Sequence, residues 1–145
     1  MLLRDYTLAG AMIAALNAQA LAADAQFYST LDPAPMTMAT RANVAGTGSV
    51  SAELNGNKLS VQGSFSGLAS AATKAELRSG SMIGVPGDVF ADLTVTPAAD
   101  GSLSGTVTLD RAKLKALRDK AVYVQINSEK ASDGALRAWL LPRQP

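Results

Sequence analysis

Apolar and polar side chains alternate along much of this chain, and the alternation is clearest between Ser49 and Phe65. A period of two predicts β-strands with one buried face. Asn55 and Gly56 interrupt the alternation, and this dipeptide between two such runs is typical of a tight hairpin turn. We therefore expect a β-hairpin whose core-facing side chains are Val50, Ala52, Leu54, Leu59, Val61 and Phe65.

Weaker alternating runs flank this hairpin and predict further short strands. They cover residues 26–31, 74–79, 88–96, 102–109, 121–127 and 135–141. Asp-Gly pairs at 100–101 and 133–134 lie beside these runs and favour turns. Asp110 is a suitable helix N-cap, and Leu114 and Leu117 would share one face of the short helix that follows it.

The same period assigns residues to the two faces of each strand. In 74–79 we expect Ala75 and Leu77 to point inward and Glu76 and Arg78 outward. In 88–96 the residues expected to share one face are Val89, Ala91, Leu93 and Val95. Together, about eight short strands and one short helix predict an all-β domain, and a β-sandwich fits this pattern better than a parallel α/β fold.

The first segment differs from the rest of the chain. Arg4 precedes an apolar run from Leu8 to Leu16, and small residues at Ala20 and Ala22 form an A-x-A site. This pattern predicts that residues 1–23 are a signal peptide, which gives a periplasmic or secreted protein. The alternative is an N-terminal helical arm that the mature protein keeps. In either case residues 24–145 form the β-sandwich domain.

Composition narrows the chemistry that the chain can perform. Its formal net charge is only +1, so it lacks the positive field that a nucleic-acid partner requires. It contains neither Cys nor His, which excludes disulfides, thiolate catalysis and a Ser-His-Asp triad. The commonest general base and the commonest metal ligand are therefore both missing.

Four glycine-punctuated stretches carry a resemblance to a known family. They read LSVQGSFSGL at 59–68, GSLSGTVTL at 101–109, AVYVQIN at 121–127 and DGALRAWLL at 133–141. In order and spacing they resemble the CHRD (chordin-type) domain over residues 27–141. The resemblance implies a Greek-key β-sandwich of the immunoglobulin-like or dismutase-like kind, outside the cytoplasm, with no established catalytic activity.

This chain departs from the family at positions where relatives often carry histidine. The family's A-H-I-H strand corresponds to Ala75–Arg78, which reads A-E-L-R, and its N-I-H-T strand corresponds to Gln125–Ser128, which reads Q-I-N-S. Glu76, Arg78 and Asn127 therefore stand where the resemblance places histidines. Arg is a cation without an acceptor and cannot replace a neutral imidazole ligand. We expect no metal and no other cofactor.

The last two predicted strands supply a candidate interface. If the loop between them closes symmetrically, Tyr123 lies opposite Trp139 and Gln125 lies opposite Arg137. With Leu141 beside the aromatic pair, these residues would form an apolar patch of the kind that marks interfaces. Two alternatives stay open: the faces are reversed, or the N-terminal arm or a loop covers the pair.

Two groups of charged residues are candidate sites. Asp88 and Asp92 are four apart on a predicted strand and would share one face, as an acid–base pair, a Ca²⁺ site or two solvated charges, of which the last is favoured. Lys113, Lys115, Arg118 and Lys120 form a basic helix face. It would meet an acidic partner or lipid headgroups, or stay solvated, which is the usual case.

These observations favour a non-catalytic, exported module that acts as a structural or accessory subunit. Its partner would be a larger periplasmic or membrane-associated complex, such as a dehydrogenase or a photosynthetic complex. The first alternative is a free-standing periplasmic module that binds a small ligand or the cell surface. The second is a metal-dependent redox protein, for which the chain lacks the usual ligands.

Overall fold

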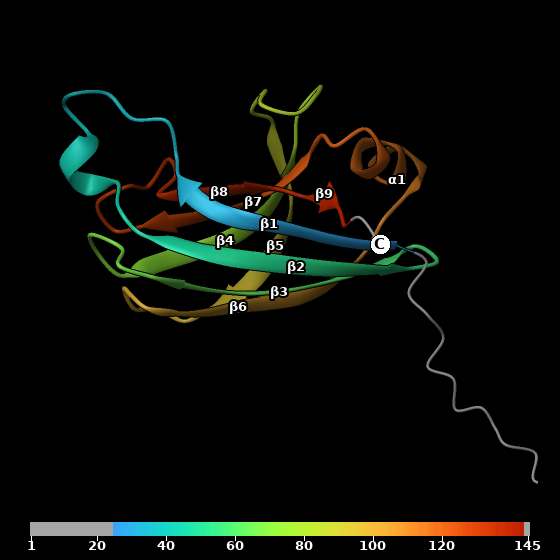
Figure 1. Cartoon of the computed structure of the whole chain (residues 1–145), viewed down its shortest axis with the longest axis horizontal. Helices are drawn as coiled ribbons and strands as arrows, with labels where there is room; N and C mark the ends of the chain where they lie inside the picture. Colours follow the sequence, from blue (N-terminus) through green and yellow to red (C-terminus); the bar gives the residue numbers. More distant parts are fainter. Residues whose placement is uncertain (1–24, 144–145) are drawn as a thin grey trace, which may run out of the picture.

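The computed structural model describes residues 25–143, and within that range it is an antiparallel all-β protein with one short α-helix (Figure 1). The predicted segment 1–23 lies outside the described residues. The strands are β1 (Ala25–Pro33), β2 (Thr47–Asn55), β3 (Lys58–Ser66), β4 (Ala72–Ser79), β5 (Asp88–Val95), β6 (Gly101–Thr108), β7 (Val122–Ser128), β8 (Leu136–Trp139) and β9 (Leu141–Pro142). The helices are α1 (Arg111–Arg118) and a 3₁₀ turn, η1 (Arg41–Asn43).

The strands close into a barrel. Their order is β2-β3-β6-β5-β4-β7-β8-β1-β9, and β1 also pairs with β2, so that the sheet returns to its start. β1 makes this closure possible because Ala25–Leu31 pairs with β2 while Asp32 and Pro33 pair with β8. The all-β class and the single short α-helix are as predicted, but hydrogen bonds join all the strands where the sequence predicted the two sheets of a sandwich.

The β2–β3 hairpin confirms the clearest sequence prediction. Leu54 pairs with Leu59 and Asn55 with Lys58, so the two turn residues are Gly56 and Asn57, one position later than the predicted Asn55–Gly56. Gly56 has φ +66°, which a residue without a Cβ adopts at little cost. The predicted core-facing side chains of both strands are buried: Val50, Ala52, Leu54, Leu59, Val61 and Phe65.

A bulge between β4 and β5 changes the predicted faces of β5. Leu77 pairs with Ala91, but the next residue, Arg78, pairs with Val89 and skips Phe90. An extra residue in one strand reverses the sides on which the following residues lie. The prediction that Val89 shares one face with Ala91 and Leu93 is therefore wrong: Val89 is 40% exposed, and Phe90 packs against the core in its place.

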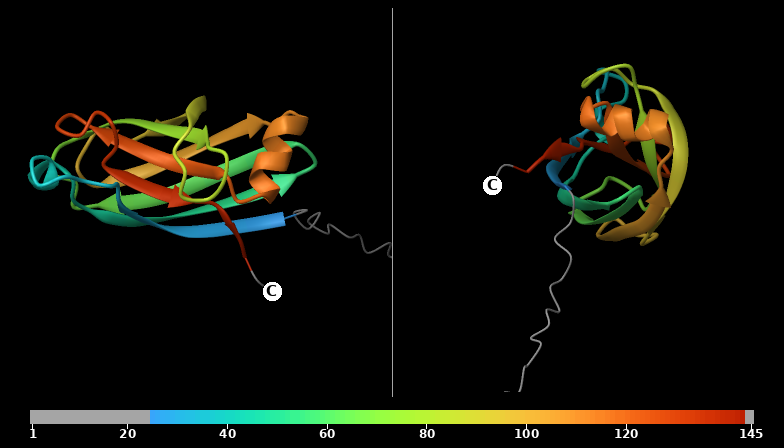
Figure 2. Two further views of the ribbon diagram at one scale, coloured as in Figure 1. Left: turned by 90° about the horizontal axis from the view of Figure 1, so that it is seen from above. Right: turned by 90° about the vertical axis from the view of Figure 1, so that its right-hand side faces the viewer.

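Helix α1 lies at one end of the barrel beside β7 (Figure 2). Its cap is the predicted one, since Asp110 Oδ1 accepts a 2.8 Å hydrogen bond from the backbone N–H of Lys113. Leu117 is fully buried and Leu114 packs partly against the same core. The apolar stripe thus fixes which side of α1 faces the barrel. Of the basic helix face, Lys115, Arg118 and Lys120 are exposed, whereas Lys113 is half-buried and donates to Ser79 Oγ.

The barrel's dependence on β1 gives a stability prediction. Leu31 is fully buried at the point where β1 passes from β2 to β8. Leu31→Ala should lower the free energy of unfolding by about 2–5 kcal/mol because it leaves a cavity there. The matched control, Thr30→Ala, is exposed on the same strand and should change it by less than about 0.5 kcal/mol. Urea unfolding followed by Trp139 fluorescence measures both, and equal effects would contradict the prediction.

Candidate functional site

The predicted pairing between β7 and β8 is present. Tyr123 of β7 pairs with Trp139 of β8, and Gln125 pairs with Arg137. The rings of Tyr123 and Trp139 are 4.3 Å apart between centroids and tilted by 38°. The guanidinium of Arg137 lies 5.5 Å from the centroid of the Tyr123 ring. The Tyr123 ring therefore contacts both an indole and a cation on the outer side of the barrel.

Tyr123 and Gln125 are nevertheless buried, with exposed fractions of 0% and 1%. Two loops, which contain Gly87 and Asp133, form hydrogen bonds with these side chains on the outer side of the sheet. The Tyr123 hydroxyl accepts from the N–H of Gly87 (3.0 Å) and donates to its carbonyl (3.2 Å), while Gln125 Nε2 donates to the Asp133 carbonyl (3.2 Å). Of the aromatic pair, loops therefore cover Tyr123 but leave Trp139 half-buried. Tyr123 and Gln125 are not available to a partner in this conformation.

The other three residues of the predicted patch remain partly accessible. Arg137, Trp139 and Leu141 are half-buried. Leu141 belongs to the short strand β9, which leaves β8 at Leu140 and pairs with β1, where Tyr28 is its partner. Tyr28 is 46% exposed. The accessible part of the patch therefore runs from β8 through β9 onto β1.

Five polar side chains form one connected group across β4, β7 and β8, here called the polar cluster. Arg78 donates from Nε and Nη2 to Glu76 Oε2, both at 2.9 Å. Asn127 Nδ2 donates to Glu76 Oε1 (3.4 Å) and Gln125 Nε2 to Asn127 Oδ1 (2.8 Å). Arg137 Nε donates to Gln125 Oε1 at 2.9 Å. The chain of bonds runs from Arg78 to Arg137 without a gap.

Hydrogen bonds within the polar cluster offset the desolvation cost of burying its side chains. Glu76 and Asn127 are only 5% and 6% exposed, and an unpaired buried carboxylate or amide would be strongly destabilising. Among the described residues, no buried side-chain nitrogen or oxygen lacks a hydrogen-bond partner. Burial by itself disfavours the charged form of Arg78, but the hydrogen bond and charge of Glu76 outweigh it and raise the pKa of the guanidinium above its ordinary value.

Sequence reasoning identified the members of the polar cluster separately and did not predict that they meet. It singled out Glu76, Arg78 and Asn127 because the family resemblance places histidines there, and Gln125 and Arg137 as part of the interface. One signal for the cluster was present. The strand Val122–Ser128 contains no charged residue, which is typical of a strand buried on both faces, so polar neighbours at its outer positions would have to pair with one another.

The contacts within the polar cluster limit what it can do chemically. The Glu76 carboxylate already accepts from Arg78 and Asn127, and the Gln125 carbonyl accepts from Arg137. Over residues 25–143, no three His, Cys, Asp or Glu side chains gather as a metal-binding group. The cluster is built to hold three strands together.

The register also separates the two aspartates that were expected to share a face. Asp92 pairs with Glu76 on the outer side of the sheet, whereas Asp88 pairs with Ser79 on the side that also carries Leu77. The bulge between these two pairs is the reason. The expectation of a shared carboxylate face is therefore wrong.

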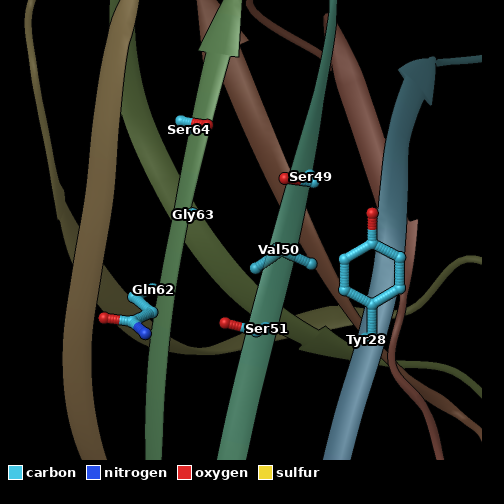
Figure 3. Close-up of a pocket in the computed structure, with 7 residues that line it drawn as sticks. All are labelled: Tyr28, Ser49, Val50, Ser51, Gln62, Gly63 and Ser64. Atoms are coloured by element: carbon cyan, nitrogen blue, oxygen red, sulfur yellow. The ribbon is translucent and has the colours of Figure 1, made fainter. Parts of the chain in front are cut away.

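Two hollows in the described surface are candidates for small ligands. One, of about 280 Å³, lies on the outer side of β1–β3, and Figure 3 shows its lining. Its residues are uncharged: Tyr28, Ser49, Val50, Ser51, Gln62, Gly63 and Ser64. The other, also about 280 Å³, lies between segments 34–44 and 130–134 and is lined in part by Lys130, Asp133 and Arg137.

Comparison with known proteins gives one match. The model of the CHRD domain matches residues 27–140, which spans β1 to β8 and includes every member of the polar cluster. No curated protein matches the chain, and no solved structure does. In residues 25–143, no helix combines the length and the apolar character that crossing a membrane requires.

The polar cluster predicts a measurable coupling between Glu76 and Arg78. Glu76→Gln should lower the free energy of unfolding by about 1–3 kcal/mol, because it leaves a part-buried guanidinium without its carboxylate. The double variant Glu76→Gln/Arg78→Met should lose less than the sum of the single variants. Lys115→Gln, in the exposed pair with Asp119, is the control and should cost less than about 1 kcal/mol. Additive losses in chemical unfolding would contradict the coupling.

The cover over Tyr123 gives a second prediction. Tyr123→Phe removes the hydroxyl that holds both backbone groups of Gly87 and should cost about 1 kcal/mol of stability. Amide hydrogen exchange at Gly87 should become faster, since its N–H loses its acceptor. Tyr28→Phe removes a hydroxyl from an exposed ring and serves as the control. Unchanged exchange at Gly87 would show that the hydroxyl does not hold the loop.

Proposed function

Because the chain belongs to the CHRD domain family, we propose that it is a non-catalytic interaction module, an accessory subunit of a larger periplasmic or membrane-associated complex. The observation that carries this proposal is the polar cluster. Glu76, Arg78 and Asn127 stand at positions where the family resemblance places histidines. Their side chains form hydrogen bonds with one another and with their neighbours. A closed structural network at these positions favours contact over chemistry as the role of the domain.

The partner surface of this proposal runs along Arg137, Trp139, Leu141 and Tyr28. Cross-strand partners lie on one side of a sheet, so Leu141 and Tyr28 point the same way. Aromatic residues and Arg carry much of the binding energy at protein interfaces. The buried residues Tyr123 and Gln125 support this surface. Trp139 packs against the Tyr123 ring and Arg137 donates a hydrogen bond to Gln125, so both side chains are positioned before a partner binds.

The proposal includes export, with residues 1–23 as the segment that directs it. Mass spectrometry of the native protein tests this point directly. A mature N-terminus near residue 23 would support cleavage of a signal peptide, whereas a native chain that begins at Met1 would favour the retained helical arm.

The relation to Greek-key sandwiches is part of the same proposal. In the strand order, β3 and β7 flank the meander β4–β5–β6. A strand that lies beside the first or last member of a three-strand meander is the arrangement from which Greek keys are built. The barrel would then be a closed variant of the immunoglobulin-like or dismutase-like sandwich.

The second candidate is a free-standing module that binds a small ligand or the cell surface. The hollow on β1–β3 favours it, because serine hydroxyls, the Gln62 amide and the half-exposed Tyr28 ring are lined up on one open strand surface (Figure 3). Hydroxyl and amide groups beside an aromatic ring suit an uncharged polar ligand. The hollow is distinct from the Trp139 surface except for Tyr28, which borders both.

Leu141→Arg tests the accessory role. The tagged native chain should retain one partner in stoichiometric amount from native membranes, and Leu141→Arg should reduce that amount at least tenfold, because a charge then faces an apolar contact. Thr106→Arg places the same charge on β6, at an exposed position, and should retain the partner. The proposal would be contradicted if the native protein were a free monomer without a partner. Equal retention of the partner by Leu141→Arg and Thr106→Arg would also contradict it.

A further inference from the structure

We propose that the chain also binds the surface of an anionic lipid membrane, through two apolar loops that project from one side of the barrel. The first loop is residues 34–46, between β1 and β2, and the second is residues 80–87, between β4 and β5. This inference goes beyond the proposed accessory role, because it uses a surface other than Trp139 and Leu141.

The exposed apolar side chains of the described residues are concentrated on these loops. Met82, Ile83 and Val85 of the second loop are 58%, 47% and 39% exposed. Met36 and Met38 of the first are 45% and 82% exposed. Outside the loops, the exposed large apolar residues are Val89, just beyond the second loop, and Tyr28. Such exposure lowers solubility, and its concentration on the two loops indicates a contact surface.

Both loops rise from the same side of the molecule. In Figure 1 the first loop stands at the upper left and the second at the upper centre, and the end-on view in Figure 2 also shows both at the top. Helix α1 lies to the right of the second loop and lower than its tip (Figure 1). A flat surface laid across the two tips would therefore have α1 on the same side of the barrel.

The bases of the loops are fixed, so their tips are held out from the barrel. Gly80 donates to the Ala121 carbonyl, and Gly87 bonds through both backbone groups to the Tyr123 hydroxyl. A Cβ on Gly87 would collide with the Ser79 carbonyl, which shows how closely the two ends of this loop approach. In the first loop, Ala34 donates to the Ala135 carbonyl. Little ordering would be required on binding.

Positive charge accompanies the apolar tips. Residues 111–120 contain five basic residues against one acidic residue, Asp119. Lys113 Nζ bonds to Ser79 Oγ at the base of the second loop and lies 5.0 Å from the Phe90 ring centroid. At the first loop, Arg41 Nη1 lies 4.0 Å from Met38 Sδ. Acidic groups lie beside these basic residues as well: Asp88 follows the second loop, Asp110 caps α1, and Asp119 pairs with Lys115.

This combination fits a lipid surface better than a protein partner. A protein partner would need a separate complementary pocket for each projecting tip. A bilayer interface is deformable and can accept both tips at the same time. Apolar side chains enter the boundary between headgroups and acyl chains, and cations at their base meet the anionic headgroups. Each Lys or Arg near such a surface strengthens binding roughly fivefold at low salt. Flexible Met side chains adapt to an irregular apolar surface.

Vesicle binding with the purified full-length chain tests the proposal. The probes are vesicles of phosphatidylcholine alone and vesicles with one-third phosphatidylglycerol, compared by co-sedimentation at low and high salt. Wild type should bind the anionic vesicles at least tenfold more strongly than the neutral ones, and salt should weaken this binding. Met82→Ser/Ile83→Ser should weaken it about tenfold or more. Arg111→Gln/Arg118→Gln should weaken it by a similar factor and reduce its salt dependence.

Tyr28→Ser is the matched control, because it removes an exposed apolar side chain outside the two loops. It should bind vesicles as wild type does. All variants keep residues 1–24, so a difference between them comes from the substituted positions. Thermal melting confirms folding, which these exposed substitutions should preserve. Equal binding by Met82→Ser/Ile83→Ser and wild type, or no preference for anionic vesicles, would overturn the proposal, and either result would leave the partner test at Leu141 unaffected.

Discussion

Strand β7 is buried on both faces, and much of the remaining structure is arranged to make that burial possible. Its inner side chains, Val122, Val124 and Ile126, fill the barrel core. Its outer side chains, Tyr123, Gln125 and Asn127, need polar partners because water does not reach them. Neighbouring strands supply Glu76 and Arg137, and the flanking loops supply backbone groups at Gly87 and Asp133.

This constraint connects the fold with the proposed roles. Because the polar cluster is satisfied internally, the outer face of β4, β7 and β8 serves as a fixed support. The same hydroxyl of Tyr123 that is satisfied by Gly87 anchors the base of the loop that carries Ile83. On the other edge, the Tyr123 ring supports Trp139. The candidate contact surfaces therefore lie around the cluster, on side chains that it holds in position.

Sequence reasoning predicted local features wherever a short-range rule applies. The β2–β3 hairpin, the Asp110 cap and the pairing of Tyr123 with Trp139 each depend on residues close along the chain or on one symmetric turn. It failed on the face of Val89, since a single skipped residue at Phe90 reverses the alternation without changing composition. It correctly placed Glu76 on the outward face but did not predict that this side chain is only 5% exposed, because a period of two distinguishes faces but not what covers them.

The sequence by itself determined the all-β class, most strand positions, the family and the absence of imidazole and thiol ligands, because these depend on periodicity, turn residues and composition. Only the tertiary structure decided that β1 closes the strands into a barrel and that loops bury Tyr123 and Gln125. It alone joined Glu76, Arg78 and Asn127 to Gln125 and Arg137. The physical reason is that closure and covering arise from contacts between residues far apart in the chain, which no local pattern records.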